Sequence, residues 1–168
     1  MTNKLQNSPK FQSKTIINLK AISDNWRFYD NLTLKTEAAA VVKANAYGLG
    51  VKKIAPILQQ NGCQTFFVSQ ISEGVELRKI LGKEANIYAL NGVLEYEVSN
   101  FVNANIIPVL NSHDQIELWR LNGKGRPFAI HIDTGMNRLG IRFDEANFDK
   151  GFNPHLIISH LACSSNPN

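Results

Sequence analysis

The sequence predicts an α/β fold, in which parallel strands are covered by helices. Short apolar runs alternate with amphipathic stretches along the chain, and the connections between them are short. The runs are apolar at successive positions, which is typical of strands buried on both faces. This order fits either a doubly wound open sheet or a (β/α) barrel. A glycine-rich phosphate loop often follows the first strand of an open sheet, and Lys43 stands there instead, which favours the barrel.

The first strand is predicted at residues 38–43, a run of small and β-branched side chains that ends in a lysine. A helix follows over residues 51–60, because its apolar residues recur at helical spacing until a glycine ends the pattern. Residues 65–69, which read TFFVS, form the second strand. The next helix is predicted from Ser72, a typical N-cap residue, and again stops at a glycine.

The same alternation continues to the end of the chain. A third strand is predicted at residues 86–90 and its helix at residues 94–104. The fourth strand covers residues 106–111, and Ser112 then caps a helix that carries isoleucine, leucine and tryptophan. The last two strands are apolar runs that each contain histidine, at residues 127–133 and 155–161.

A complete barrel of this kind needs eight strand–helix units and typically about 250 residues. The chain supplies about six strands over 168 residues. We therefore expect an incomplete TIM-like (β/α) barrel over residues 15–168, from a truncated form or a fragment. Residues 1–14 are polar and contain no apolar segment, so we expect them to be a disordered leader rather than a secretory signal.

The composition excludes several classes of function. No apolar stretch is long enough to span a membrane, and the 18 basic residues are scattered rather than gathered into a nucleic-acid patch. A net charge of +4 suits a small anionic ligand such as a phosphate ester. Cys63 and Cys163 lie outside any metal-ligand spacing, so we expect reduced thiols, no metal and a cytoplasmic location.

Lys43 is the first candidate for chemistry, because a buried strand ends there and a glycine-bearing loop follows. Removal from water favours the neutral amine, and a neutral amine can attack an aldehyde to form a Schiff base. The alternative is a lysine whose ammonium group reaches solvent from the strand end. The run by itself leaves both interpretations open.

Three motifs carry a family resemblance. VVKANAYGLG at residues 41–50 closely resembles the cofactor-lysine signature of the alanine racemase family. HIDTGMNRLG at residues 131–140 resembles the arginine motif of that family, and SHLAC at residues 159–163 resembles its histidine motif. The resemblance begins near residue 15 and extends to the end of the chain. It implies a barrel of the alanine racemase type with pyridoxal 5'-phosphate as cofactor.

The resemblance also implies an isomerase that interconverts L-alanine and D-alanine through a pyridoxal phosphate aldimine and supplies D-alanine for peptidoglycan. The full-length family implies a homodimer. We expect this chain to lack the β-rich C-terminal domain of the family, which carries a tyrosine base that acts across the dimer interface, and therefore to have little activity alone. Residues 15–19 resemble the N-terminal strand that joins the absent domain.

The roles of four residues follow from the resemblance. Lys43 is expected to bind the cofactor and to act as a proton-transfer base. Tyr47 is expected to hydrogen-bond the cofactor phosphate, and Arg138 to contact the cofactor and the substrate carboxylate. His160 is expected near the cofactor ring. Lys43 ends the first predicted strand, Arg138 follows the fifth, and His160 lies near the end of the sixth, so these motifs should meet at one end of the barrel.

Each of these residues also has an ordinary structural interpretation. Tyr47 could pack under its loop, Arg138 could lie on the surface after a turn shaped by residues 133–135, and His160 could be a buried histidine satisfied by the backbone. Glu73 and Glu76 are expected to form a solvated helix face. The alternative function is a non-catalytic pyridoxal phosphate-binding barrel protein, and a chain without function is a third possibility.

The sequence departs from the family pattern at His131. In several family members the matching residue is a lysine modified to a carbamate, which steadies the arginine. Histidine cannot be modified in that way. If His131 faces Arg138, we expect it either to orient the guanidinium as a neutral hydrogen-bond acceptor or to leave it less constrained.

Overall fold

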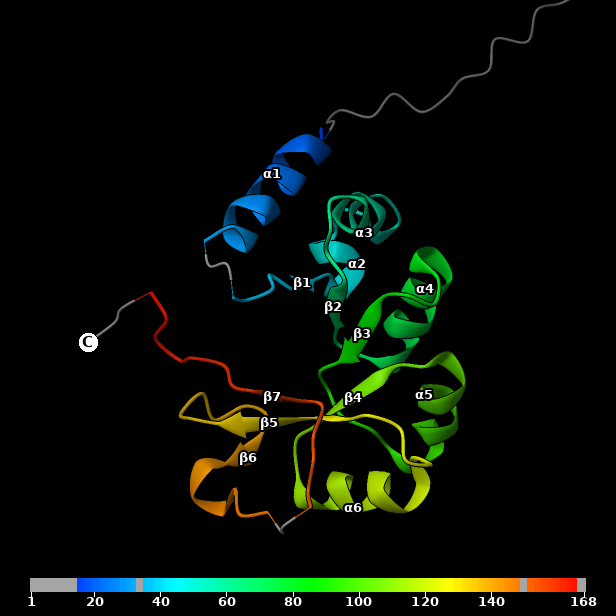
Figure 1. The fold of residues 1–168 in the computed structure, drawn as a ribbon, viewed down its shortest axis with the longest axis vertical. Helices are drawn as coiled ribbons and strands as arrows, with labels where there is room; N and C mark the ends of the chain where they lie inside the picture. Colours follow the sequence, from blue (N-terminus) through cyan, green and yellow to red (C-terminus); the bar gives the residue numbers. More distant parts are fainter. Residues whose placement is uncertain (1–14, 33–34, 149–150, 166–168) are drawn as a thin grey trace, which may run out of the picture.

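The computed structural model describes residues 15–32, 35–148 and 151–165, so the leader predicted at residues 1–14 lies outside the described residues. The chain begins with a helix and then alternates strands with helices (Figure 1). The helices are α1 (Leu19–Asp30), α2 (Lys43–Tyr47), α3 (Val51–Gln60), α4 (Ile71–Leu81), α5 (Val98–Ala104) and α6 (His113–Asn122), with short 3-10 helices η1 (Glu95–Glu97) and η2 (Phe143–Glu145). The strands are β1 (Ala40–Val41), β2 (Thr65–Val68), β3 (Asn86–Ala89), β4 (Ile107–Leu110), β5 (Ala129–Asp133), β6 (Ile141–Arg142) and β7 (Leu156–Ile158).

The strands form one parallel sheet in which neighbours follow chain order. The order is β1-β2-β3-β4-β5-β6, and β7 also pairs with β5. A doubly wound sheet reverses its strand order at a switch point, and this sheet does not. The sequential order and the helices along one side of the curved sheet (Figure 1) make the fold an incomplete TIM-like barrel, as the sequence predicts.

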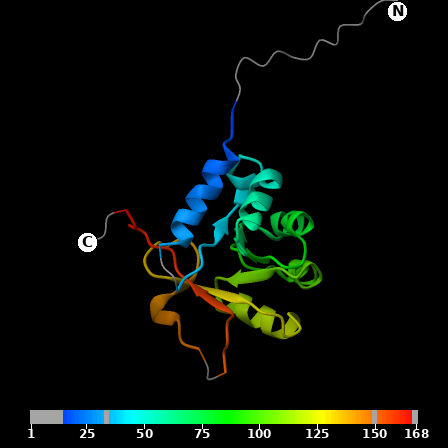
Figure 2. The same ribbon diagram turned by 45° about the horizontal axis from the view of Figure 1, so that its top comes forward.

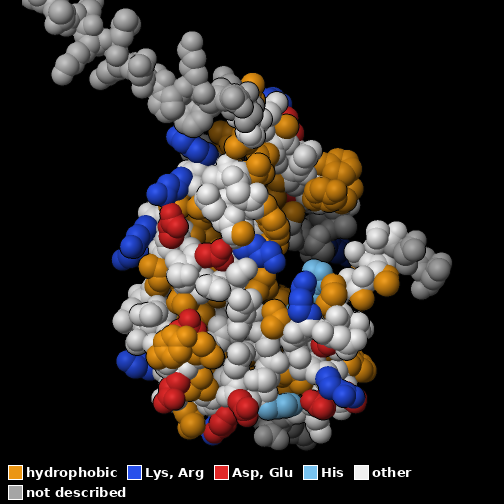
Figure 3. Space-filling model, turned by 180° about the vertical axis from the view of Figure 1, so that it is seen from behind, with side chains coloured by type: hydrophobic (Ala, Val, Ile, Leu, Met, Phe, Trp, Pro, Cys, Tyr) orange, Lys and Arg blue, Asp and Glu red, His pale blue; other side chains and the backbone are white. Residues whose placement is uncertain are grey.

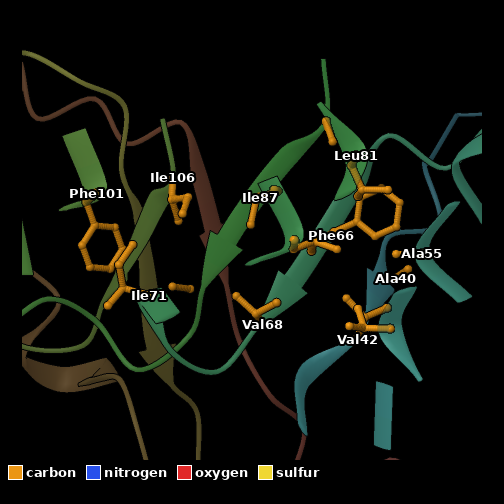
Figure 4. Close-up of a cluster of buried hydrophobic side chains, with 14 of the residues drawn as sticks. Ala40, Val42, Ala55, Phe66, Val68, Ile71, Leu81, Ile87, Phe101 and Ile106 are labelled. Carbon is orange, nitrogen blue, oxygen red and sulfur yellow. The ribbon is translucent and has the colours of Figure 1, made fainter. Parts of the chain in front are cut away.

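The larger core lies between the sheet and its helices. Phe66, Val68 and Ile87 point from the strands toward apolar side chains of the helices (Figure 4). A smaller cluster on the opposite face of the sheet contains Tyr88 and Val109. Because alternate residues of one strand enter these two clusters, the strands read as continuous apolar runs. Full burial of one such side chain stabilises the fold by about 1.5–3 kcal/mol.

Residues 15–19, which resemble the N-terminal strand of the family, form no strand in this chain. Residues 15–18 have no regular structure, and Leu19 begins α1, a helix that the sequence analysis missed. The side chain of Asn18 caps this helix by accepting a hydrogen bond from the backbone N–H of Ala21 (3.1 Å). Leu19, Ile22 and Trp26 share one face and pack against the core, and α1 lies beside α3 (Figure 2).

The other predicted strands are present but shorter. β1 stops at Val41, although the N–H of Val42 still donates to the carbonyl of Phe67 (2.8 Å). The sixth predicted strand is represented by β7, and the two-residue β6 was not predicted. Pairing with the end of β5 holds β6 in place, through Ile132 opposite Ile141, so its own short sequence carries little signal.

Candidate active site

A pocket of about 450 Å³ opens at the carboxyl ends of the strands. All the residues that the sequence predicts for the site line this one pocket, namely Lys43, Tyr47, Arg138 and His160. The face seen in Figure 3 carries cationic and histidine side chains beside a hollow. A volume of this size suits a small-molecule ligand, since ligand pockets typically measure about 300–1,000 Å³. The structure therefore brings together residues that are distant in the sequence.

Lys43 stands at the start of an unusual turn. The turn is hydrogen-bonded like a helix, but Ala44 to Tyr47 have positive φ angles of 49° to 55°. Left-handed backbone costs L-residues about 1–2 kcal/mol each. Backbone hydrogen bonds within the turn oppose this cost, for example from the N–H of Ala46 to the carbonyl of Val42 (2.9 Å). Strain of this kind is typical of sites that hold a side chain in a required place.

The side chain of Asn45 joins the turn to the next helix. Its Oδ1 atom accepts a hydrogen bond from the backbone N–H of Val51 (2.9 Å), the first residue of α3. Its carbonyl accepts another from the N–H of Gly50 (2.9 Å). Gly50 has a φ of 98°, which glycine adopts without steric cost. Lys43 is thus half-buried at the base of a short, well-bonded connection.

Glu73 contributes to the same region, and the expectation of a solvated side chain is wrong for this residue. Its Oε1 atom accepts a hydrogen bond from the N–H of Ala44 (2.7 Å), and Oε2 accepts from the N–H groups of Ser69 (2.7 Å) and Gln70 (3.2 Å). Glu76, on the same helix, is more exposed and pairs with Lys52 at 3.6 Å. α4 begins at Ile71 with Gln70 as its N-cap, so the N-cap predicted at Ser72 is wrong and Glu73 is the third residue of the helix. This position is typical of a capping glutamate, but nothing in the local sequence points to the contact with Ala44.

Arg138 follows a turn that Asp133 organises. The carboxylate of Asp133 accepts hydrogen bonds from the N–H groups of Gly135 (2.9 Å) and Asn137 (3.0 Å), and these bonds lower the pKa of Asp133. The hydroxyls of Thr134 and Ser159 lie 2.7 Å apart, so the arginine loop is joined to the segment that carries His160. The second and third sequence motifs are therefore in direct contact.

His131 is buried on the pocket wall, with 6% of its surface exposed. Its Nδ1 atom lies 3.2 Å from Oδ1 of Asn111. Burial lowers the pKa of His131, and the nearby His160 and Arg138 side chains lower it further, while Asp133 acts in the opposite direction. His131 is therefore a neutral imidazole at pH 7.

The pocket suits an anion that also carries apolar groups. Lys43 and Arg138 supply positive charge, and the described residues that line the pocket include no carboxylate. Val41, Phe67 and Ile158 supply apolar wall. Among the described residues, no group of three His, Cys, Asp or Glu side chains could hold a metal ion. No helix in the described part of the chain is long and apolar enough to cross a membrane.

Fold and pocket together define a parallel (β/α) barrel with a lysine-bearing site at its carboxyl end. The model of the alanine racemase N-terminal domain matches residues 17–168 of this sequence. The chain therefore belongs to the alanine racemase family, as its three motifs suggest.

Individual relatives agree with this family. The alanine racemase of Rickettsia prowazekii (strain Madrid E) is 42% identical over an alignment of 159 positions, and the match covers 88% of this chain and 39% of that protein. The alanine racemase of Rhizobium meliloti (strain 1021) is 38% identical over an alignment of 173 positions, gaps included, and the match covers 95% of this chain and 45% of that protein.

Among solved structures, alanine racemase from Bartonella henselae with covalently bound pyridoxal phosphate has a TM-score of 0.72 and 44% identity, and the match covers 77% of this chain and 39% of that chain. The chain thus spans less than half the length of these relatives.

Proposed function

We propose that this chain forms the cofactor-binding part of a pyridoxal phosphate-dependent alanine racemase, which interconverts L-alanine and D-alanine. The observation that carries this proposal is the convergence of Lys43, Tyr47, Arg138 and His160 on one pocket. Because the chain spans less than half of its relatives, racemisation is proposed for the complete enzyme. The relatives named above are alanine racemases, which supports this substrate.

The described residues fit pyridoxal phosphate. A lysine amine that is half-buried in a pocket can bind an aldehyde, and the cationic lining suits a phosphate. When bound, pyridoxal phosphate supplies an electron sink for the carbanion at the substrate α-carbon. Lys43 would hold the cofactor through Nζ, and the hydroxyl of Tyr47 would donate a hydrogen bond to its phosphate.

The remaining work of the site falls to the protein side chains. Once free of the cofactor, the amine of Lys43 would take a proton from the substrate α-carbon or return one to it. Arg138 would donate two parallel hydrogen bonds to the alanine carboxylate, which fixes the α-carbon in front of Lys43. His160 would extend the polar wall of the site. Inversion needs a second proton donor on the opposite face of the carbanion, which we assign to the rest of the complete enzyme.

We further propose that the complete enzyme acts as a homodimer in the cytoplasm and supplies D-alanine for peptidoglycan. The name of the relatives, alanine racemase, supports D-alanine as a product, while the dimer and the cytoplasmic location rest on the family resemblance. Sedimentation analysis of the complete enzyme would test the dimer, since a monomer that racemises alanine would contradict it.

The cofactor site can be tested on the chain itself by borohydride reduction in the presence of pyridoxal phosphate, followed by peptide mass mapping. We expect one pyridoxyl group per chain, on Lys43. The variant K43R should lose this label, while the matched control K52R should keep it, because Lys52 is exposed on α3 and does not line the pocket. Label spread over many lysines, or unchanged in K43R, would refute the proposed site. A complete enzyme that is labelled at Lys43 but does not racemise alanine would instead be a non-catalytic binder.

A further inference from the structure

We propose that Glu73 is a positioning residue that fixes the backbone at Lys43 and thereby aims the lysine side chain into the pocket. This inference rests on the proposed function of Lys43. Glu73 does not line the pocket itself. It lies in the first turn of α4, and its carboxylate reaches the connections that follow both β1 and β2.

The bond to Ala44 acts directly on Lys43. The N–H of Ala44 belongs to the peptide unit that begins at the carbonyl carbon of Lys43, and this unit is planar. Its hydrogen bond to Oε1 of Glu73 (2.7 Å) therefore fixes the plane of this unit relative to α4. Without this bond, ψ of Lys43 and φ of Ala44 could change, and the backbone that carries the Lys43 side chain would no longer be held in place relative to α4.

Only a group with two acceptor atoms can make these contacts together. Oε1 accepts from the connection after β1, while Oε2 accepts from the N–H of Ser69 (2.7 Å), which follows β2 and lines the pocket. Ionised carboxylates form shorter and stronger hydrogen bonds than neutral groups do. A glutamine would keep the shape of the side chain, but its NH₂ group would face a backbone N–H on one of the two sides.

Helix capping alone does not explain this geometry. A capping glutamate needs only the N–H of the N-cap residue, which here is Gln70 at 3.2 Å. The bonds to Ala44 and Ser69 are both shorter, at 2.7 Å, and neither residue belongs to α4. The left-handed turn that begins at Ala44 is strained, so an anchor at its first N–H has a clear structural use.

The test compares E73Q with the matched control E76Q, which makes the same chemical change on the same helix. Amide hydrogen exchange, measured by NMR on the 168-residue chain, is the main measurement. In E73Q we expect the amides of Ala44 and Ser69 to exchange about tenfold faster or more, as expected for the loss of a charge-assisted hydrogen bond. E76Q should leave both rates unchanged.

A second measurement tests whether the hydrogen bonds of Glu73 affect the reaction of Lys43. With limiting pyridoxal phosphate and borohydride, the rate of labelling at Lys43 should fall about tenfold in E73Q and remain unchanged in E76Q, because misplacement of a reacting group slows its reaction. Unchanged exchange at Ala44, or a change confined to Gln70 and α4, would overturn the proposal. Glu73 would then act only as a capping residue of α4. If the unmutated chain is not labelled at Lys43, the proposed function fails. The exchange rates of the Ala44 and Ser69 amides still test whether Glu73 holds this backbone.

A second variant keeps the proposal testable in case E73Q does not fold. In E73D the carboxylate stands on a side chain that is one methylene shorter, so it should not reach both connections, and the amide of Ala44 or of Ser69 should exchange about tenfold faster. Unchanged exchange at both amides in E73D would overturn the proposal.

Discussion

At the scale of single residues, the neighbours of His131 determine which of its nitrogens carries the proton. The side-chain Nδ2 of Asn111 donates to the carbonyls of Leu90 and Val109, both at 2.9 Å, so its Oδ1 is the atom that faces His131. Oδ1 can only accept, and Nδ1 of His131 must therefore carry the hydrogen. This leaves Nε2 as an acceptor, which agrees with the neutral acceptor considered for this position.

A pH dependence follows from the buried His131. Its pKa is lowered in the folded chain, so the unfolded chain takes up a proton first as the pH falls below about 6.5. The stabilising contribution of the neutral ring is therefore complete above that pH and is lost below it. We expect the His131 signal in an NMR titration to have its midpoint below 6.5, and a midpoint at or above 6.5 would contradict this account.

Most residues of the pocket's polar lining are predictable from the sequence, but Glu73 is not. Lys43, Arg138 and His160 could be placed together because each follows a parallel strand, and the carboxyl ends of such strands meet at one edge. Glu73 acts on Ala44, which is 29 positions away in the chain. Nothing in the local sequence shows that α4 directs this carboxylate back toward the first strand.

At the scale of elements, one arginine ties several of them together at the opposite end of the barrel. Arg78, in α4, donates hydrogen bonds to four backbone carbonyls, which belong to Gly82 (2.8 Å), Ala85 (2.7 Å), Ala104 (3.1 Å) and Asn105 (2.6 Å). These carbonyls lie after α4, before β3 and at the end of α5. The planar fork of donors in arginine suits such a set, and a lysine ammonium does not.

We expect R78A to lower the free energy of unfolding by about 1.5–3 kcal/mol, because carbonyls that Arg78 satisfies lose a charged donor. R78K should recover only part of this loss. The control K79A replaces an exposed neighbour on the same helix and should stay within about 0.5 kcal/mol of the unmutated chain. Urea denaturation measures all three variants, and equal midpoints for R78A and K79A would disprove the role of Arg78.

The sequence predicted strands better than it predicted the first helix. Strands such as β2 and β4 are buried on both faces, so their apolar runs were unambiguous. The apolar residues of α1 do have helical spacing, as Leu19, Ile22 and Trp26 show. Because residues 15–19 resemble a strand of the family, this helical periodicity was not used to predict a helix. Such a strand depends on sheet partners, and the described residues before α1 have none.

At the scale of the whole molecule, the sheet is curved but not closed. In the described part of the chain, β1 pairs only with β2 and β7 only with β5. Apolar side chains near these edges are exposed, including Val41 (44%), Ile157 (62%) and Leu161 (65%). Unpaired strand edges with apolar neighbours favour association between chains.

We therefore expect the isolated chain to associate as its concentration rises, with light scattering as the measurement. I157K should reduce the association without lowering the melting temperature, because Ile157 is exposed and leaves no cavity when replaced. Replacement of an exposed residue far from both edges, such as Lys83→Glu, should not change the association. A chain that stays monomeric at every concentration would contradict this view of the edges.

The turn after Lys43 shows that a sequence motif and its geometry are separable. The residues KANAY are rich in alanine, and in a free peptide their intrinsic preference is for a right-handed helix. In the folded chain four of these residues, Ala44 to Tyr47, adopt the left-handed, mirror-image conformation instead. The handedness around Lys43 is therefore imposed by contacts made elsewhere in the molecule. A short peptide with this sequence would therefore keep the family signature but would not adopt the left-handed turn that places Lys43 at the pocket.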